Sequence, residues 1–135
     1  MSDPQIWTVA QGRVLCPAPF MIVGIVNVTP DSFYDGGLFF RQDEAVAQSL
    51  RLIEQGAAMV DIGGESTRPF SERVDASEEL GRILPVISRV LAEQPEACLS
   101  IDTYKAEVAA RVLEAGAAAI NDVGACRFDP GLPEV

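Results

Sequence analysis

A ten-residue segment recurs in the chain at an offset of 60 residues, and this repeat limits the folds that the chain can adopt. Residues 52–61 (LIEQGAAMVD) align with residues 112–121 (VLEAGAAAIN). In each copy an amphipathic stretch ends at a glycine and a short apolar run follows, which is typical of a helix that leads into a buried strand. One βα unit takes about thirty residues. The repeat therefore predicts a parallel α/β fold in which one further strand separates the two related strands.

Hydrophobic periodicity divides the chain into a leading hairpin and four βα units. The hairpin is expected at residues 6–15. Strands are expected at residues 21–28, 58–62, 98–101 and 118–122. The apolar run at residues 20–26 predicts that the first of these strands is buried on both faces.

Three helices are expected between these strands. The first covers residues 42–55 and follows a loop at residues 29–40, and Gly56 is its C-cap. The second opens near Asp75, with Glu78 as its capping-box partner, and Pro85 predicts a kink or an early break in it. The third runs from Thr103, as its N-cap, to residue 115.

Four strands are half the number in a (β/α)8 barrel, which typically needs about 250 residues. The fold class expected is therefore α/β: a single partial domain, residues 1–135, in which a leading hairpin (1–19) precedes the amino-terminal half of a (β/α)8 TIM-type barrel (20–135). In such a half barrel the first and fourth strands are open edges, which favour pairing with another chain. We expect a homodimer for this reason.

Composition excludes several classes of function. The net charge of −10 argues against a nucleic-acid partner, and the absence of histidine excludes a His-based triad and ordinary zinc sites within this chain. The longest apolar run is too short to cross a membrane, so no membrane association is expected. Three widely spaced cysteines without a CxxC pattern indicate reduced thiols and a cytoplasmic location.

Polar residues gather where three of the expected strands end. Residues 27–33 (NVTPDSF) follow the first strand, residues 61–69 (DIGGESTRP) the second, and residues 100–103 (SIDT) the third. In α/β proteins ligands bind at the carboxyl ends of the strands. The pattern predicts an active site that is assembled from several strand ends.

The first two of these segments together resemble the signature motifs of the dihydropteroate synthases, pterin-binding enzymes of folate synthesis that are the target of sulfonamides. Residues 100–103 and 120–123 (INDV) resemble that family's third and fourth strand ends, so the likeness covers residues 20–123. It implies a (β/α)8 barrel that condenses 6-hydroxymethyl-7,8-dihydropterin diphosphate with 4-aminobenzoate. The products are 7,8-dihydropteroate and diphosphate, and Mg²⁺ is the implied cofactor.

The resemblance also assigns substrate-binding and metal-binding roles. Asp102 matches the pterin carboxylate and Asn121 its amide partner, while Asn27 matches the asparagine linked to Mg²⁺. Without the resemblance, Asp102 is equally well explained as a helix N-cap and Asn121 as an Asx-turn residue. Asp61 is expected to be an internal structural carboxylate.

Two loops complete the expected site. Thr67 is expected to bind the diphosphate, and Arg68 to neutralise the leaving group or contact 4-aminobenzoate. Their neighbours Ser66 and Pro69 belong to the same loop. The first loop supplies three further residues, which the resemblance places over the pterin and the aminobenzoate pocket: Asp31, Ser32 and Phe33.

The sequence departs from the family pattern at two points. Phe70 stands where the family usually has a small glycine, so this loop is expected to fold differently or to grip the substrate more tightly. The family's residues on strands five to eight, among them a second pterin aspartate, a lysine and an arginine–histidine pair, are missing. We therefore expect little or no synthase activity from this chain alone.

Two other functions stay open at this point. One is a methyltetrahydrofolate-dependent methyltransferase, a pterin barrel that would share Asp102 and Asn121 but would not need the two aminobenzoate loops. The other is a non-catalytic remnant that binds pterin weakly. The presence of both loop motifs favours the synthase.

Overall fold

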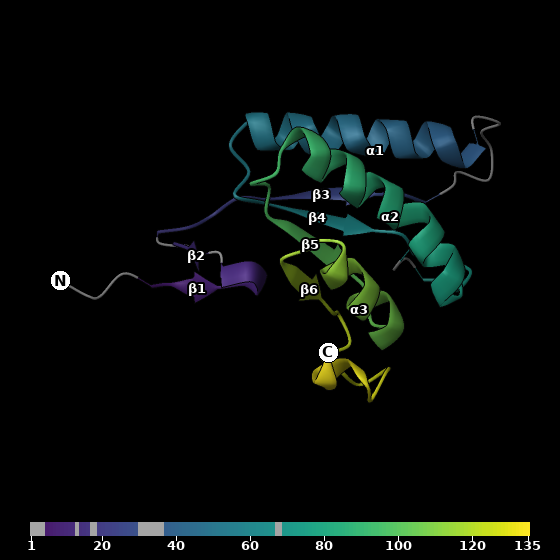
Figure 1. Ribbon diagram of the computed structural model, residues 1–135. Helices are drawn as coiled ribbons and strands as arrows, with labels where there is room; N and C mark the ends of the chain where they lie inside the picture. The colour runs from purple at the N-terminus through teal and green to yellow at the C-terminus, as the bar shows by residue number, and fades with distance from the viewer. Residues whose placement is uncertain (1–4, 13, 17–18, 30–36, 67–68) are drawn as a thin grey trace.

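The fold is a four-stranded parallel sheet with three helices packed on one face (Figure 1). A computed structural model describes residues 5–12, 14–16, 19–29, 37–66 and 69–135. The sheet has the order β3-β4-β5-β6, with β3 at Val23–Asn27, β4 at Met59–Gly63, β5 at Leu99–Asp102 and β6 at Ala119–Asn121. The helices are α1 at Gly37–Glu54, α2 at Ala76–Glu93 and α3 at Ala106–Glu114. Each helix connects two neighbouring parallel strands, as the repeat predicts.

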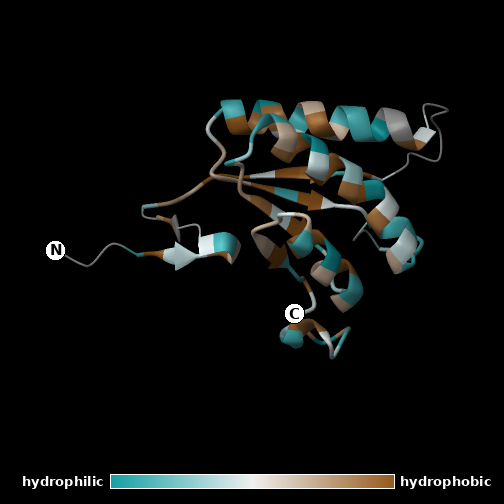
Figure 2. Cartoon of the chain, viewed as in Figure 1, coloured by the Kyte–Doolittle hydropathy of each residue, from teal (hydrophilic) through white to brown (hydrophobic). Residues whose placement is uncertain are grey.

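The core lies between the helices and one face of the sheet. Figure 2 shows that the strands of the four-stranded sheet are mostly hydrophobic and that the helices mix hydrophilic and hydrophobic residues. Val60 and Ile62 of β4 and Ile83 of α2 are fully buried in this layer. Burial of such side chains contributes about 1.5–3 kcal/mol each.

The first expected strand is not buried on both faces, and this prediction was wrong. β3 is an edge strand whose residues alternate between the helix-covered face and the open face. Val26 is 4% exposed, whereas Val23 and Ile25 on the open face are 40% and 68% exposed. The open face of β3 is therefore apolar, and the described residues cover it only in part.

A short hairpin closes the amino-terminal end of the sheet. β1 (Trp7–Thr8) pairs antiparallel with β2 (Val14–Leu15), and the 3₁₀ turn η1 (Ala10–Gly12) lies between them. The Ala10 amide donates to the Ala118 carbonyl at 2.9 Å, and Val9 packs in a cluster that includes Met59 and Cys98. These contacts lie at the starts of β4, β5 and β6. The opposite, carboxyl ends of the strands are left for a functional site.

The two copies of the repeat have the same backbone conformation. The Ala57 amide donates to Leu52 O at 3.0 Å, and the Ala117 amide donates to Val112 O at 3.0 Å. Gly56 and Gly116 follow their helices with φ of 99° and 107°, a region that favours glycine. The repeat thus encodes the same helix-to-strand turn twice.

Helix α2 continues through Pro85, so the early break that the sequence predicts does not occur. A proline at this position cannot donate to the carbonyl of Gly81, four residues earlier. Gln42 of α1 replaces the lost bond, because its Nε2 donates to Gly81 O at 2.9 Å. Gln42 is 4% exposed, and its amide also reaches Arg82 O at 3.3 Å. A side chain from the neighbouring helix therefore supplies the hydrogen bond to Gly81 O that Pro85 cannot donate.

Replacing Gln42 by alanine is expected to lower the free energy of unfolding by about 1–2 kcal/mol, since Gly81 O loses its donor. Urea denaturation measures this change. In a Pro85→Ala background the restored backbone N–H can donate to Gly81 O, so the same substitution should cost less. Equal costs in both backgrounds would show that Gln42 does not compensate for the proline.

Two local predictions differ from the structure. Helix α1 begins at Gly37 rather than residue 42, because Gly37 adopts a φ of 67° and ends the preceding loop itself. Thr103 is not the N-cap of α3; Lys105 holds that position. The acceptor for the first helical amide comes from Asp129, whose Oδ2 accepts from Ala106 N at 2.7 Å.

The remaining features of the fold are local. A short 3₁₀ turn, η2 at Leu132–Glu134, stands near the carboxyl terminus. The three cysteines are free, and only Cys98 is buried. Across the described ranges, none of the helices combines the length and the apolar character that crossing a membrane requires.

Candidate functional site

Three of the predicted site residues lie in one row across the sheet. The strand register pairs Asn27 with Gly63, Gly63 with Asp102, and Asp102 with Asn121. The row is the last one of the sheet, at the carboxyl ends of β3, β4, β5 and β6. Neighbouring strands are about 4.8 Å apart, so the row spans about 14 Å. Two amides and one carboxylate therefore face the same open end of the sheet.

Gly63 keeps the middle of this row free. A Cβ added at this position would lie 3.5 Å from both Asn27 Oδ1 and Asp102 Oδ2. The two oxygens therefore flank the space above the glycine. Any larger residue in β4 at this point would fill that space.

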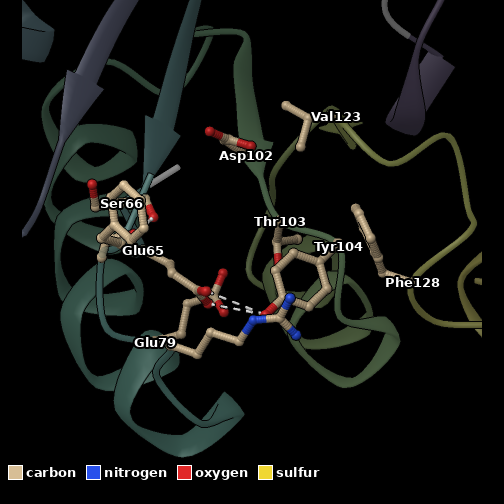
Figure 3. A pocket seen from close by; sticks show the side chains of 11 residues that line it. Glu65, Ser66, Glu79, Asp102, Thr103, Tyr104, Val123 and Phe128 are labelled. Carbon is tan, nitrogen blue, oxygen red and sulfur yellow. Dashed lines mark hydrogen bonds between the residues drawn. The ribbon is translucent and has the colours of Figure 1, made fainter. Parts of the chain in front are cut away.

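A cavity of about 340 Å³ opens beside Asp102 (Figure 3). Tyr104 and Phe128 form one wall, with ring centroids 5.6 Å apart in an edge-on contact. Glu65, Ser66 and Phe70 contribute from the loop after β4. The cavity combines aromatic walls with a few polar groups and is large enough for a small heterocyclic ligand.

The acidity of Asp102 is reduced by its surroundings. Burial, and then the charges of Asp61, Glu79, Asp122 and Glu65, raise the pKa of Asp102 from 3.8 to about 6. A carboxylate that is destabilised in this way gains more than an ordinary one from a ligand that donates hydrogen bonds or brings positive charge. This property marks Asp102 as the chemically distinctive group of the row.

A buried ion-pair network supports the loops around the cavity. Lys105, the only lysine of the chain, contacts Glu65 of the β4 loop and lies 2.6 Å from Glu79 of α2. The side chains of Lys105, Glu65 and Glu79 are 15%, 12% and 1% exposed. Tyr104 Oη donates to Glu65 at 3.2 Å, as Figure 3 shows. The network joins the β4 loop, helix α2 and the loop after β5.

The network also affects the pKa of Lys105. Burial alone would lower the pKa of Lys105, but hydrogen bonds from its ammonium group to Glu65 and Glu79 outweigh burial and raise it. Lys105 is therefore charged throughout the neutral range. On the other side of the same loop, Arg82 Nη1 donates to Gly64 O at 2.7 Å. Two cations thus hold the segment that precedes Ser66.

This network was not predicted from the sequence, although one signal for it was present. Glu79 lies four residues before Ile83 and directly before Leu80, so it falls inside the apolar stripe of the second helix. A charged residue at such a position is almost never fully buried unless it is paired. The partner, Lys105, could not be found from the sequence because the two lie 26 residues apart.

The other predicted residues divide between described and undescribed parts of the chain. Ser66 is partly buried at the cavity, and its carbonyl accepts from Ser71 Oγ at 2.6 Å, whereas Pro69 is exposed. Outside the described residues lie five predicted site residues: Asp31, Ser32, Phe33, Thr67 and Arg68. Phe70, which departs from the family pattern, is fully exposed with a φ of 67°, a conformation that favours glycine.

Asn121 and Asp61 contact each other across the sheet. Asn121 Nδ2 donates to Asp61 Oδ2 at 3.0 Å, and Asp61 is 7% exposed. Within the ranges that the structure describes, no group of three Asp, Glu, Cys or His side chains is placed to hold a metal ion. Asn27 Oδ1 and the space above Gly63 offer one oxygen ligand and room beside it.

Comparison with known proteins identifies the family of this chain. Residues 23–135 match the family described as pterin binding enzyme. The dihydropteroate synthase of Bacillus subtilis (strain 168) is 46% identical over 115 residues, which cover 85% of this chain and 40% of the relative. The chain therefore spans less than half the length of this relative.

Solved structures show the same likeness. A dihydropteroate synthase of Xanthomonas albilineans with 4-aminobenzoic acid matches with a TM-score of 0.82 and 50% identity, over 91% of this chain and 45% of that one. The same enzyme in complex with 7,8-dihydropteroate matches with a TM-score of 0.76 and 48% identity, over 91% of this chain and 44% of that one. The fold is an α/β half barrel with polar side chains gathered at its strand ends. The chain belongs to the pterin-binding enzyme family, and its fold is the amino-terminal half of a (β/α)8 barrel.

Proposed function

We propose that this chain forms the pterin-binding half of a dihydropteroate synthase. That enzyme is a transferase that condenses 6-hydroxymethyl-7,8-dihydropterin diphosphate with 4-aminobenzoate to give 7,8-dihydropteroate and diphosphate. The observation that carries the proposal is the row of Asn27, Gly63, Asp102 and Asn121 at the strand ends. Relatives that match over this region are dihydropteroate synthases, one of them solved with 4-aminobenzoic acid and with 7,8-dihydropteroate.

Asp102 and Asn121 account for pterin recognition. The amino-pyrimidinone edge of a pterin presents neighbouring N–H donors, and a carboxylate can accept two of them side by side. Asn121 stands next to Asp102 in the row and can both donate to and accept from the ring. Tyr104 and Phe128 supply apolar walls that exclude water from the ring.

Asn27 fits the role of a Mg²⁺ ligand. Mg²⁺ binds through few protein oxygens, keeps several waters and contacts substrate phosphates, so one amide oxygen beside an open space suits it. When bound, Mg²⁺ would neutralise charge on the diphosphate leaving group. Isothermal titration with Mg²⁺ and inorganic diphosphate checks this role: heat that the Asn27→Ala variant retains in full would contradict it.

The two loops provide the remaining groups of the proposal. Thr67 and Arg68 are assigned to the diphosphate and 4-aminobenzoate, next to Ser66 and Pro69. Asp31, Ser32 and Phe33 are assigned to closure over the pterin and aminobenzoate. The reaction needs no enzymatic nucleophile, since the aromatic amine attacks the pterin methylene as diphosphate departs. Catalysis then consists of positioning and charge stabilisation.

The chain alone is expected to show little or no synthase activity, because it spans about 40% of the length of the Bacillus subtilis relative. A product assay with both substrates and Mg²⁺ tests this, with that relative as positive control. Product formation at a comparable rate would contradict it. The function itself is tested by ligand preference: tighter binding of methyltetrahydrofolate than of pterin diphosphate would favour the methyltransferase.

Pterin binding by this chain is expected to weaken as the pH falls through about 6. The pKa of Asp102 is about 6, so the carboxylate that accepts the pterin N–H groups is lost below that pH. Titration calorimetry at pH 5 and pH 7.5 measures the change. In an Asp102→Asn variant the affinity is already weak and should not change in this way, and an unchanged pH dependence in that variant would assign the effect to another group.

A homodimer is the assembly that we propose for the isolated chain. β3 and β6 are the two edges of the sheet, and Val23, Ile25 and Ile22 leave apolar surface exposed beside β3. Light scattering at working concentration tests self-association, and a clean monomer would count against it. The three free cysteines support a reducing, cytoplasmic setting.

A further inference from the structure

The two carboxyl-terminal residues of the repeat, Asp61 and Asn121, hydrogen-bond to each other although they lie 60 residues apart. Asp61 stands on the open face of β4, two residues before Gly63. Its register partner is Ser100. The row of Asn27, Gly63, Asp102 and Asn121 is called the ligand row below. Asn121 reaches Asp61 diagonally from β6. The small side chain of Ser100 on the intervening strand leaves room for this contact.

The chemistry of Asp61 decides which atom of Asn121 faces it. An ionised carboxylate only accepts hydrogen bonds, so it selects the Nδ2 side of the asparagine amide. Nδ2 donates to Asp61 Oδ2 at 3.0 Å, which leaves Oδ1 and the second N–H of Asn121 available to a ligand. Asn121 then presents its Oδ1 acceptor and its second N–H donor to a ligand in one fixed arrangement.

The carboxylate of Asp61 carries a structural cost. It is 7% exposed, and its Oδ1 is buried with no hydrogen-bond partner among the described residues. An unsatisfied buried oxygen destabilises a fold, so stability alone would favour another residue at this position. This cost makes Asp61 a candidate for a functional role.

We propose that Asp61 is a positioning residue that fixes the amide orientation of Asn121 and so sets the hydrogen-bond polarity of the pterin site. The inference rests on the proposed function for the identity of the ligand, but not for the orientation itself. Asp61 touches no substrate in this account. It acts only through Asn121.

The orientation is tested without ligand. In ¹⁵N-labelled protein, one Nδ2 proton of Asn121, assigned with an Asn121→Ala variant, should resonate downfield, and Asp61→Asn should reduce that shift, because a neutral amide oxygen is a weaker acceptor than a carboxylate. Asp122→Asn is the matched control: Asp122 also acts on Asp102, but its side chain accepts from the backbone amides of Gly124 and Cys126. A resonance that Asp61→Asn leaves unchanged would overturn the inference, whether or not pterin binds.

A double-mutant cycle tests the consequence for binding. Asp61→Asn is expected to weaken binding of 6-hydroxymethyl-7,8-dihydropterin diphosphate about tenfold without lowering the thermal midpoint. In the Asn121→Ala background the same substitution should change the affinity less than about twofold. Equal losses in both backgrounds would overturn the inference. If the unaltered chain binds no pterin, the proposed function fails for it, and the amide resonance alone decides the orientation.

Discussion

Replacing Asp102 by alanine is expected to weaken binding of pterin diphosphate to this chain about 100-fold. The carboxylate lies in the middle of the ligand row and is placed to accept two N–H groups of the pterin edge. Hydrogen bonds to charged groups contribute about 1.5–3 kcal/mol each, and every 1.4 kcal/mol is tenfold in affinity. Titration calorimetry near pH 7.5, where Asp102 is ionised, measures the loss.

A surface carboxylate provides the matched control for this experiment. Asp43 of α1 pairs with Arg89 and its side chain is 66% exposed, so Asp43→Ala removes the same charge far from the ligand row. It should leave the affinity within about twofold, in line with the small effects of exposed ion pairs. If Asp43→Ala and Asp102→Ala weaken binding equally, the effect comes from net charge, and Asp102 is not the pterin ligand.

Replacing Lys105 by methionine is expected to lower the free energy of unfolding by about 3–5 kcal/mol. The substitution leaves Glu79, 1% exposed, and Glu65, 12% exposed, without their common cation. Removal of one partner from a buried ion pair costs this much because the remaining charge is uncompensated. Chemical denaturation at neutral pH measures it. Because the partners raise the pKa of Lys105, its contribution should be lost only when the pH rises above its usual value of 10.5.

Two further variants separate burial from charge in this result. Arg111→Met breaks a pair with Glu114 in which both side chains are more than half exposed, and it should cost less than about 1 kcal/mol. The double variant Lys105→Met with Glu79→Met should recover part of the lost stability, because it replaces buried charges by apolar groups. A cost for Lys105→Met no larger than that for Arg111→Met would show that the network does not hold the loops.

The sequence predicted the fold through local signals. The repeated helix–glycine–strand segment defines the parallel architecture, since Gly56 and Gly116 both adopt the left-handed conformation that such a turn needs. The N-cap at Asp75 is also confirmed, with Asp75 Oδ1 accepting from Glu78 N at 2.8 Å, whereas the Glu78 side chain pairs with Arg82 and does not complete the expected capping box. Signals of this kind depend on neighbours within one or two turns of helix, and a single sequence contains them.

Features that depend on distant partners could not be predicted. Pro85 does not end its helix because Gln42, 39 residues away from the carbonyl that it satisfies, donates the missing bond. Thr103 does not cap the third helix because Asp129 reaches back to Ala106. The exposure of Ile25 follows from its place on an edge strand, which the composition of the strand does not reveal.

The candidate site was predicted only in part, because some of its residues are placed by strand ends and others depend on distant partners. The structure brings Asn27, Asp102 and Asn121 into one row, since each ends a strand and parallel strands end together. Tyr104 and Lys105 follow the same strand but act through Glu65 and Glu79, which belong to other elements. The roles assigned to Asp31, Ser32, Phe33, Thr67 and Arg68 stay predictions.

One titration tests the central claim most directly: the unaltered chain with 6-hydroxymethyl-7,8-dihydropterin diphosphate, with and without Mg²⁺. The account predicts binding that Mg²⁺ strengthens, because Asp102 and Asn121 take the pterin ring while Asn27 stands at the other end of the row beside the space above Gly63. Absence of binding with Mg²⁺ present, by a chain that is folded by circular dichroism, would contradict the claim that these four strand ends already form a pterin site.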